Sequence, residues 1–112
     1  MKNLLITFFF ISLSSFSQDF PDGMVAVEFN ASFNKSNEVA WLPKLSDCKT
    51  QRVDITADSR WSKEYKIVVV PTIVIFNNNE EVKRFQANIM MTMEATKSEV
   101  QNSIDEIVME AF

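Results

Sequence analysis

The chain has 112 residues, a length that bounds it to one domain. It carries 11 basic and 15 acidic residues, and a net charge of −4 argues against a nucleic-acid partner. It contains no histidine, the commonest zinc ligand and general base, and its single cysteine, Cys48, excludes an intramolecular disulfide.

Residues 1–18, "MKNLLITFFFISLSSFSQ", have the pattern of a secretory signal peptide. Lys2 precedes an apolar run, and small serines follow it, which predicts cleavage near Ser17 or Gln18. The alternative is an uncleaved membrane anchor, but the run is shorter than the roughly 20 apolar residues that a spanning helix needs. We therefore expect an exported domain, residues 19–112, that is periplasmic or secreted and free of the membrane after cleavage. Its charge, with 10 basic and 15 acidic residues, would be −5.

The first half of the domain has the pattern of a strand, a helix and a second strand. Residues 24–29 form a short apolar run that predicts a buried strand. Residues 36–45 have apolar side chains at helical spacing, and Pro43 should kink or end that helix. Residues 50–55, "TQRVDI", alternate like a strand.

A second helix and a third strand follow. Residues 57–67 predict a short helix in which Asp58 is the N-cap and Trp61 and Tyr65 share a face. The run "VVVPTIVIF" predicts a strand that begins at or after Pro71, because proline cannot lie inside a central strand.

The chain closes with a hairpin and a helix. "FNNNEEVKRF" predicts two strands around an asparagine-rich turn. Thr96 and Glu99 form a capping box at the start of the last helix. Its core-facing residues would be Val100, Ile104, Ile107, Val108 and Ala111. A helix between the first two strands implies that they are parallel, and the hairpin adds antiparallel strands to an α/β fold.

The segments "KEYKIVVVPTIVIFNNNEEVKRF" and "VAVEFNASF" resemble two parts of the thioredoxin family. The first is similar to the family's tyrosine, isoleucine, cis-proline, threonine, apolar strand, hairpin and returning strand. The second resembles the strand that leads into the family's active site. The resemblance runs from about Val25 to Val108 and implies a thioredoxin-like fold, with about four strands in a mixed sheet flanked by three helices. It would be a minimal version, since the family's first strand and helix have no counterpart.

The resemblance places a degenerate active site at the corner after the first strand. Phe33 falls on the family's tryptophan, Asn34 on the first cysteine, Lys35 and Ser36 on the glycine and proline, and Asn37 on the second cysteine.

A second alignment, counted back from Pro43, instead puts Lys35 and Glu38 at the cysteine positions. Neither alignment supplies sulfur, and a carboxamide cannot attack a disulfide, so the resemblance implies a redox-inactive homologue without the Cys-x-x-Cys motif. The turn is then either a recognition surface or a place where Asn34 or Ser36 caps the helix.

The resemblance also implies a cis bond between Val70 and Pro71, close to the corner. That bond would leave the Val70 backbone free to pair with an extended peptide, although a purely structural bend is the alternative. The implied binding groove consists of Phe33, Val70, Pro71, Thr72, Met90 and Met91.

Glu28 falls on the family's buried acid, and Lys35 is a candidate partner for its charge. Met90, Met91 and Met93 lie in a loop near the implied groove. They could pack in the core, offer an adaptable apolar surface or bind copper(I), and we favour the core.

The sequence favours a protein that is not an enzyme and has no cofactor or metal. The leading hypothesis is an exported peptide- or protein-binding module that uses the groove at the cis-proline loop. The rival is a one-thiol redox protein acting through Cys48, which could also link two chains as a dimer. A structural subunit of an exported complex is a third possibility.

Overall fold

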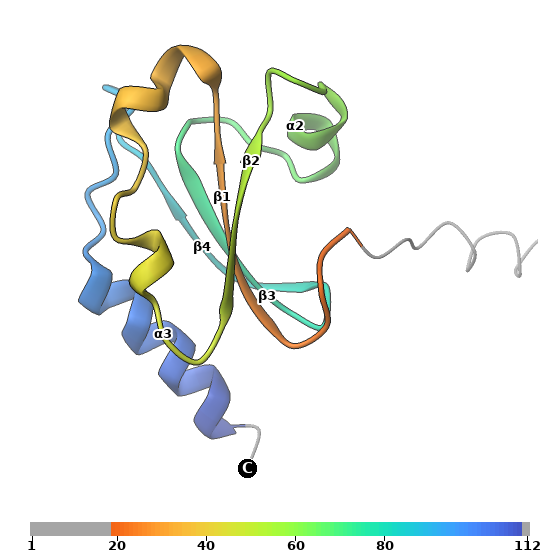
Figure 1. Cartoon of the computed structure of the whole chain (residues 1–112), viewed down its shortest axis with the longest axis vertical. Helices are drawn as coiled ribbons and strands as arrows, with labels where there is room; N and C mark the ends of the chain where they lie inside the picture. Colours follow the sequence, from red (N-terminus) through yellow and green to blue (C-terminus); the bar gives the residue numbers. More distant parts are fainter. Residues whose placement is uncertain (1–18, 111–112) are drawn as a thin grey trace, which may run out of the picture.

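The computed structural model describes residues 19–110 and has a four-stranded mixed sheet in the order β2-β1-β3-β4 (Figure 1). Strand β1 pairs in parallel with β2 and antiparallel with β3, and β3 pairs antiparallel with β4. This confirms the predicted α/β class and mixed sheet. In chain order the elements are β1 (Met24–Asn30), the 3₁₀ helices η1 (Ser32–Asn37) and η2 (Leu42–Lys44), β2 (Lys49–Asp54), α2 (Arg60–Glu64), β3 (Thr72–Asn77), β4 (Glu80–Gln86) and α3 (Lys97–Glu110).

Helices cover both faces of the sheet, so the central strands β1 and β3 are buried on both sides (Figure 1). On one face, Val27 and Phe29 of β1 pack with Trp61 and Tyr65 of the α2 region. On the other face, Ala26 packs in a cluster that includes η2 and α3. Burial on both sides explains why these strands read as nearly continuous apolar runs.

The last two strands and the last helix follow the sequence signals. Strand β3 begins directly after Pro71. Asn78 and Asn79 have φ values of 52° and 65°, the left-handed conformation that a tight hairpin turn requires. The Glu99 N–H donates to Thr96 Oγ1 (3.2 Å), and the Thr96 N–H donates to Glu99 Oε1 (3.1 Å), which completes the predicted capping box. Val100 and Ile104 of α3 are fully buried, whereas Ala111 lies outside the described residues.

Helix α2 is shorter than the predicted helix. Asp58 Oδ1 accepts the N–H of Arg60 (2.9 Å), although the residue at the cap position is Ser59. Trp61 and Tyr65 stack with ring centroids 6.0 Å apart, as their spacing predicts.

The helix predicted for residues 36–45 is wrong. At Glu38 the backbone is extended (ψ 151°), and the 3₁₀ helices η1 and η2 lie on either side. The Val39 N–H donates to Glu28 Oε2 (2.8 Å), and the Val39 carbonyl accepts from Arg52 Nη2 (2.6 Å). The Val39 N–H is therefore taken by a side chain of the sheet, and its carbonyl is shared between Arg52 and the Leu42 N–H (3.2 Å), a bond of 3₁₀ spacing.

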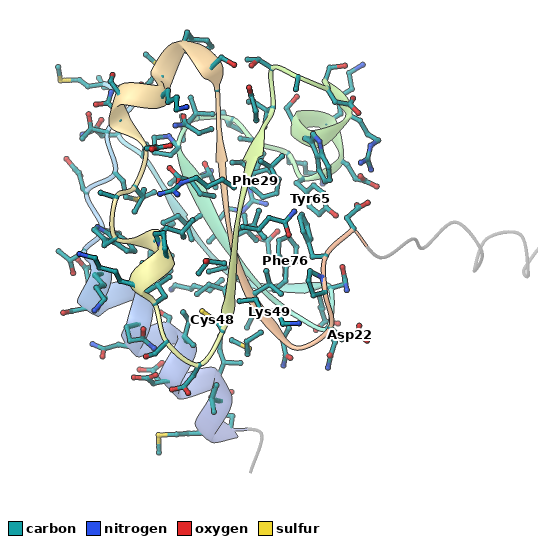
Figure 2. All side chains as sticks on the ribbon, viewed as in Figure 1. Asp22, Phe29, Cys48, Lys49, Tyr65 and Phe76 are labelled. Atoms are coloured by element: carbon teal, nitrogen blue, oxygen red, sulfur yellow. The ribbon has the colours of Figure 1, made fainter. Side chains whose placement is uncertain are left out.

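The segment before β1 is fixed by Phe20. Its ring packs against those of Phe29, Tyr65 and Phe76, which Figure 2 labels, and its backbone N–H and carbonyl bond to the side chain of Asn79 (2.9 and 2.8 Å). Among residues 19–110 there is no helix long and apolar enough to cross a membrane. The predicted signal peptide, residues 1–18, lies outside the described residues.

Candidate functional site

The buried side chain of Asn34 joins three segments at the end of the sheet where β1 terminates. Asn34 lies in η1 and is 3% exposed. Its Nδ2 lies 3.1 Å from Asn30 Oδ1, 3.1 Å from the Met91 carbonyl oxygen and 3.4 Å from the Val70 carbonyl oxygen. Its Oδ1 accepts from Asn37 Nδ2 (2.9 Å). We call this arrangement the Asn34 network.

The Asn34 network corrects one predicted role for the corner. The residue at the cap position of η1 is Ala31, with no side-chain cap bond, so neither Asn34 nor Ser36 caps this helix. Instead Asn34 fastens the corner to the loop before β3 and to the loop after β4. The position that the resemblance aligns with the family's first cysteine is therefore a buried connector.

The Val70–Pro71 peptide bond is cis and adjoins the corner. Because the Val70 carbonyl accepts from Asn34, the expectation of a free Val70 backbone is wrong for that group. Within the described residues the Val70 N–H has no hydrogen-bond partner. Val70, Pro71 and Thr72 are all buried, so their side chains offer little contact surface, contrary to the predicted groove.

Five apolar side chains around the Asn34 network are open to solvent. We call them the apolar rim: Phe33 (72% exposed), Val68 (80%), Ile89 (97%), Met90 (76%) and Met91 (37%). Phe33 belongs to η1, Val68 to the loop before Pro71, and the other three to the loop after β4. The hydrogen bonds of Asn34 to Val70 and Met91 hold these three segments together.

Sequence reasoning found Phe33, Met90 and Met91 but missed Val68 and Ile89. Met93, from the same loop, packs against the core beside α3. The three loop methionines therefore do not share one environment, which disfavours copper(I) binding by this set. In the described part of the chain, no group of three cysteine, aspartate or glutamate side chains could hold a metal ion.

Glu28 is fully buried, and its partner is Arg52 and not the candidate Lys35. Arg52 Nε lies 3.0 Å from Glu28 Oε1 and 3.7 Å from Glu38 Oε2. Burial raises the pKa of Glu28, while the Val39 N–H and the Arg52 guanidinium oppose that rise.

A cleft of about 320 Å³ opens beside this pair, and we call it the corner cleft. At the edge of the cleft, the Asp54 carboxylate accepts hydrogen bonds from Ser32 Oγ (2.5 Å) and from the hydroxyl and the N–H of Thr56. These bonds lower the pKa of Asp54 to about 2. The lining residues are Glu28, Asn30, Ala31, Ser32, Lys35, Glu38, Arg52, Val53 and Asp54.

Cys48 lies far from the corner. It precedes Lys49, and Lys49 pairs with Val25 near the start of β1, whereas the corner follows the end of β1 (Figure 2). The thiol is half-buried, and burial together with Asp47 raises its pKa. Cys48 therefore stays protonated at neutral pH, in its less nucleophilic form.

No protein-family model matches the chain, and a comparison with curated proteins finds no match. Solved structures do match. The thioredoxin of Schistosoma mansoni is 21% identical with a TM-score of 0.61, and the match covers 85% of this chain and 86% of that one. The fold is that of thioredoxin.

Two further structures agree with the thioredoxin fold. A mutant thioredoxin from Halobacterium salinarum NRC-1 is 19% identical with a TM-score of 0.61, covering 76% of this chain and 74% of that one. Thioredoxin 1 of Thermosipho africanus TCF52B is 22% identical with a TM-score of 0.58, covering 78% and 97%. Identities this low establish the thioredoxin fold and no activity.

Proposed function

We propose that this thioredoxin-fold protein is a non-catalytic module that binds extended polypeptide segments over the apolar rim. The observation that carries the proposal is the exposure of the rim, in which four side chains are more than 70% open to solvent. Exposed apolar side chains gathered on neighbouring segments are a mark of interaction sites in soluble proteins.

The chemistry of the rim suits an extended partner. Phe33 supplies a rigid aromatic contact, and the unbranched Met90 and Met91 can adapt to different side chains. The unpartnered Val70 N–H offers one backbone donor, a contact that peptide recognition by strand-like pairing uses. Asn34 holds the contributing loops in place, so a partner meets an ordered surface.

The positions of the carboxamides and of Cys48 are less consistent with a thiol-disulfide exchange enzyme than with a binding module. The corner holds carboxamides where the resemblance to thioredoxin would place thiols, and Cys48 is half-buried at the other end of the sheet. Export to the periplasm or the cell exterior remains part of the proposal, supported by the signal-peptide pattern of residues 1–18.

Substitutions in the rim should weaken peptide binding. We expect the purified protein to select peptides from a random phage-displayed library, and Phe33→Ser with Met90→Ser to weaken their binding about tenfold or more, since truncated interface anchors often cost above about 1 kcal/mol each. Fluorescence anisotropy with a selected peptide measures the change.

Met109→Ser is the matched control for this prediction, because Met109 is similarly exposed (73%) but lies in α3. Thermal unfolding verifies that each variant is folded. The proposal fails if no peptide is selected, or if the rim variant and the control bind equally well.

The protein should not reduce disulfides catalytically. With dithiothreitol as reductant, we expect insulin reduction at the uncatalysed rate, because cycling through an intramolecular disulfide needs two sulfurs and the chain has one cysteine. Turbidity of the precipitating insulin chains is the measurement. A clear acceleration that disappears in Cys48→Ser would instead establish the one-thiol mechanism.

A further inference from the structure

We propose that the bound segment carries a basic side chain, lysine or arginine, which enters the corner cleft while neighbouring apolar side chains cover the rim. This inference rests on the proposed function and specifies the chemical class of the partner. The observation behind it is that one short segment, η1, contributes Ser32 and Lys35 to the cleft and Phe33 to the rim.

Helix η1 presents different residues on its different sides. The segment consists of two short 3₁₀ turns joined at Asn34, where the backbone is not helical (φ −115°, ψ 20°). Ser32 and Lys35 both line the corner cleft, and Asn34 and Asn37 are hydrogen-bonded to each other. Phe33 occupies a third side and is exposed. A segment that crosses η1 can therefore contact the rim and the cleft together.

The charges of the cleft favour a cation. Its lining contains three carboxylates, Glu28, Glu38 and Asp54, against the two cations Lys35 and Arg52, a net charge of −1. A basic side chain that enters the cleft would neutralise this net charge.

The two cations of the cleft are not equally available. Arg52 is engaged by Glu28, by the Val39 carbonyl and, at 3.7 Å, by Glu38. Lys35 is exposed and has no ion pair within the described residues, so its flexible side chain can move aside.

The carboxylates that a ligand can reach are those of Glu38 and Asp54, which are both exposed. Asp54 stays ionised, because its hydrogen bonds to Ser32 and Thr56 stabilise the carboxylate. An acidic ligand side chain would meet these two negative groups. Of the two cations only Lys35 has no carboxylate partner within the described residues, because Arg52, although its side chain is 38% exposed, is paired with Glu28 and Glu38. The cleft therefore discriminates in favour of lysine or arginine and against aspartate or glutamate.

The test uses a peptide selected by phage display, synthesised in matched forms that carry Arg, Gln or Glu at each position flanking its apolar residues. At one position we expect the Arg form to bind about three- to fivefold more tightly than the Gln form, as for a partly exposed ion pair, and the Glu form more weakly than both. Raising the salt to about 1 M should reduce the differences.

Substitutions of acidic and basic residues of the cleft should change the preference for the Arg form of the peptide in opposite directions. Glu38→Gln and Asp54→Asn should each reduce the preference for Arg about two- to threefold, whereas Lys35→Gln should increase it by a similar factor. Glu80→Gln makes the same charge change as Glu38→Gln at the start of β4, near the opposite end of the sheet, and should leave the preference unchanged.

The two levels of the proposal fail separately. If binding depends on Phe33 and Met90 but the Arg, Gln and Glu forms bind equally at every position, the basic partner is ruled out and the binding module stands. If Glu80→Gln alters the preference as much as Glu38→Gln, the cleft assignment is likewise overturned. If binding ignores the rim, or no peptide is selected, both proposals fail.

Discussion

Replacing Asn34 with leucine is expected to lower the free energy of unfolding by about 2–4 kcal/mol, because unpaired buried polar groups each cost about 1–3 kcal/mol. Leucine has a similar volume, so the change removes hydrogen bonds and leaves no large cavity. The groups that lose this partner are the Val70 carbonyl oxygen, whose bond is buried, and Asn30 Oδ1 and the Met91 carbonyl oxygen, whose bonds are partly buried. The exposed Asn37 amide can bond to water instead.

Urea unfolding at neutral pH measures this loss, and Asn37→Ala is the control. Asn37 is exposed, and its side chain bonds only to Asn34 within the described residues, so its removal should cost about 0.5–1 kcal/mol. A loss at Asn34 no larger than that at Asn37 would contradict the Asn34 network. Because Asn34 holds the loops of the rim together, we also expect Asn34→Leu to weaken peptide binding.

The Asn34 network could not be predicted from the sequence. An asparagine at a strand-to-helix corner is equally consistent with a local cap, and local patterns favour that interpretation. Its actual partners at Val70 and Met91 lie 36 and 57 residues away, so they become neighbours only when the sheet forms. The resemblance to thioredoxin located the corner, but it could not show that the side chain there is buried.

The rim was predicted only in part, for a related reason. Val68 and Val70 belong to one apolar run, yet Val68 is 80% exposed and Val70 is 7% exposed. Within a strand, alternation assigns residues to faces, but this stretch precedes β3 and follows no period. By contrast β1, β3 and the capping box of α3 carry regular local signals, and these elements were predicted close to their observed bounds.

The failed helix at residues 36–45 also has a long-range cause. Its apolar spacing is compatible with a helix, but Glu28 binds the Val39 N–H and Arg52 binds the Val39 carbonyl. Both side chains come from neighbouring strands of the sheet. The Glu28–Arg52 pair therefore shapes the chain between η1 and η2 as well as one wall of the corner cleft.

Arg52→Gln should accordingly destabilise the protein, and the loss should grow with pH. Removing one partner of a buried ion pair costs up to about 3–5 kcal/mol. Arg52 is partly exposed and Glu28 can take up a proton, so we expect about 2–3 kcal/mol near neutral pH. The measurement is urea unfolding of the variant and the wild type at about pH 5 and about pH 7.5.

The loss of stability in Arg52→Gln should grow with pH because the pKa of Glu28 is raised in the folded state. Its folded-state pKa exceeds the ordinary value of 4.5, so the folded state holds this proton more tightly than the unfolded state does. Stability contributed by Glu28 is therefore lost as pH rises from the unfolded-state pKa through the folded-state pKa. Losing Arg52 removes an influence that lowers the pKa, which raises it further and widens that window.

Comparing the free energy of unfolding of the variant with that of the wild type at each pH separates the effect of Glu28 from the effects of other carboxyl groups. Asp54 and Glu81 have lowered pKa values, so their stabilisation is lost as pH falls, but it is lost in both proteins alike. The double variant Glu28→Gln with Arg52→Gln is the control. It has no carboxyl group at position 28, so its loss relative to the wild type should not grow with pH and should instead shrink somewhat, because the wild type itself loses the Glu28 contribution as pH rises. An Arg52→Gln loss that is equal at both pH values would show that Arg52 acts on the Val39 carbonyl and not through the charge of Glu28.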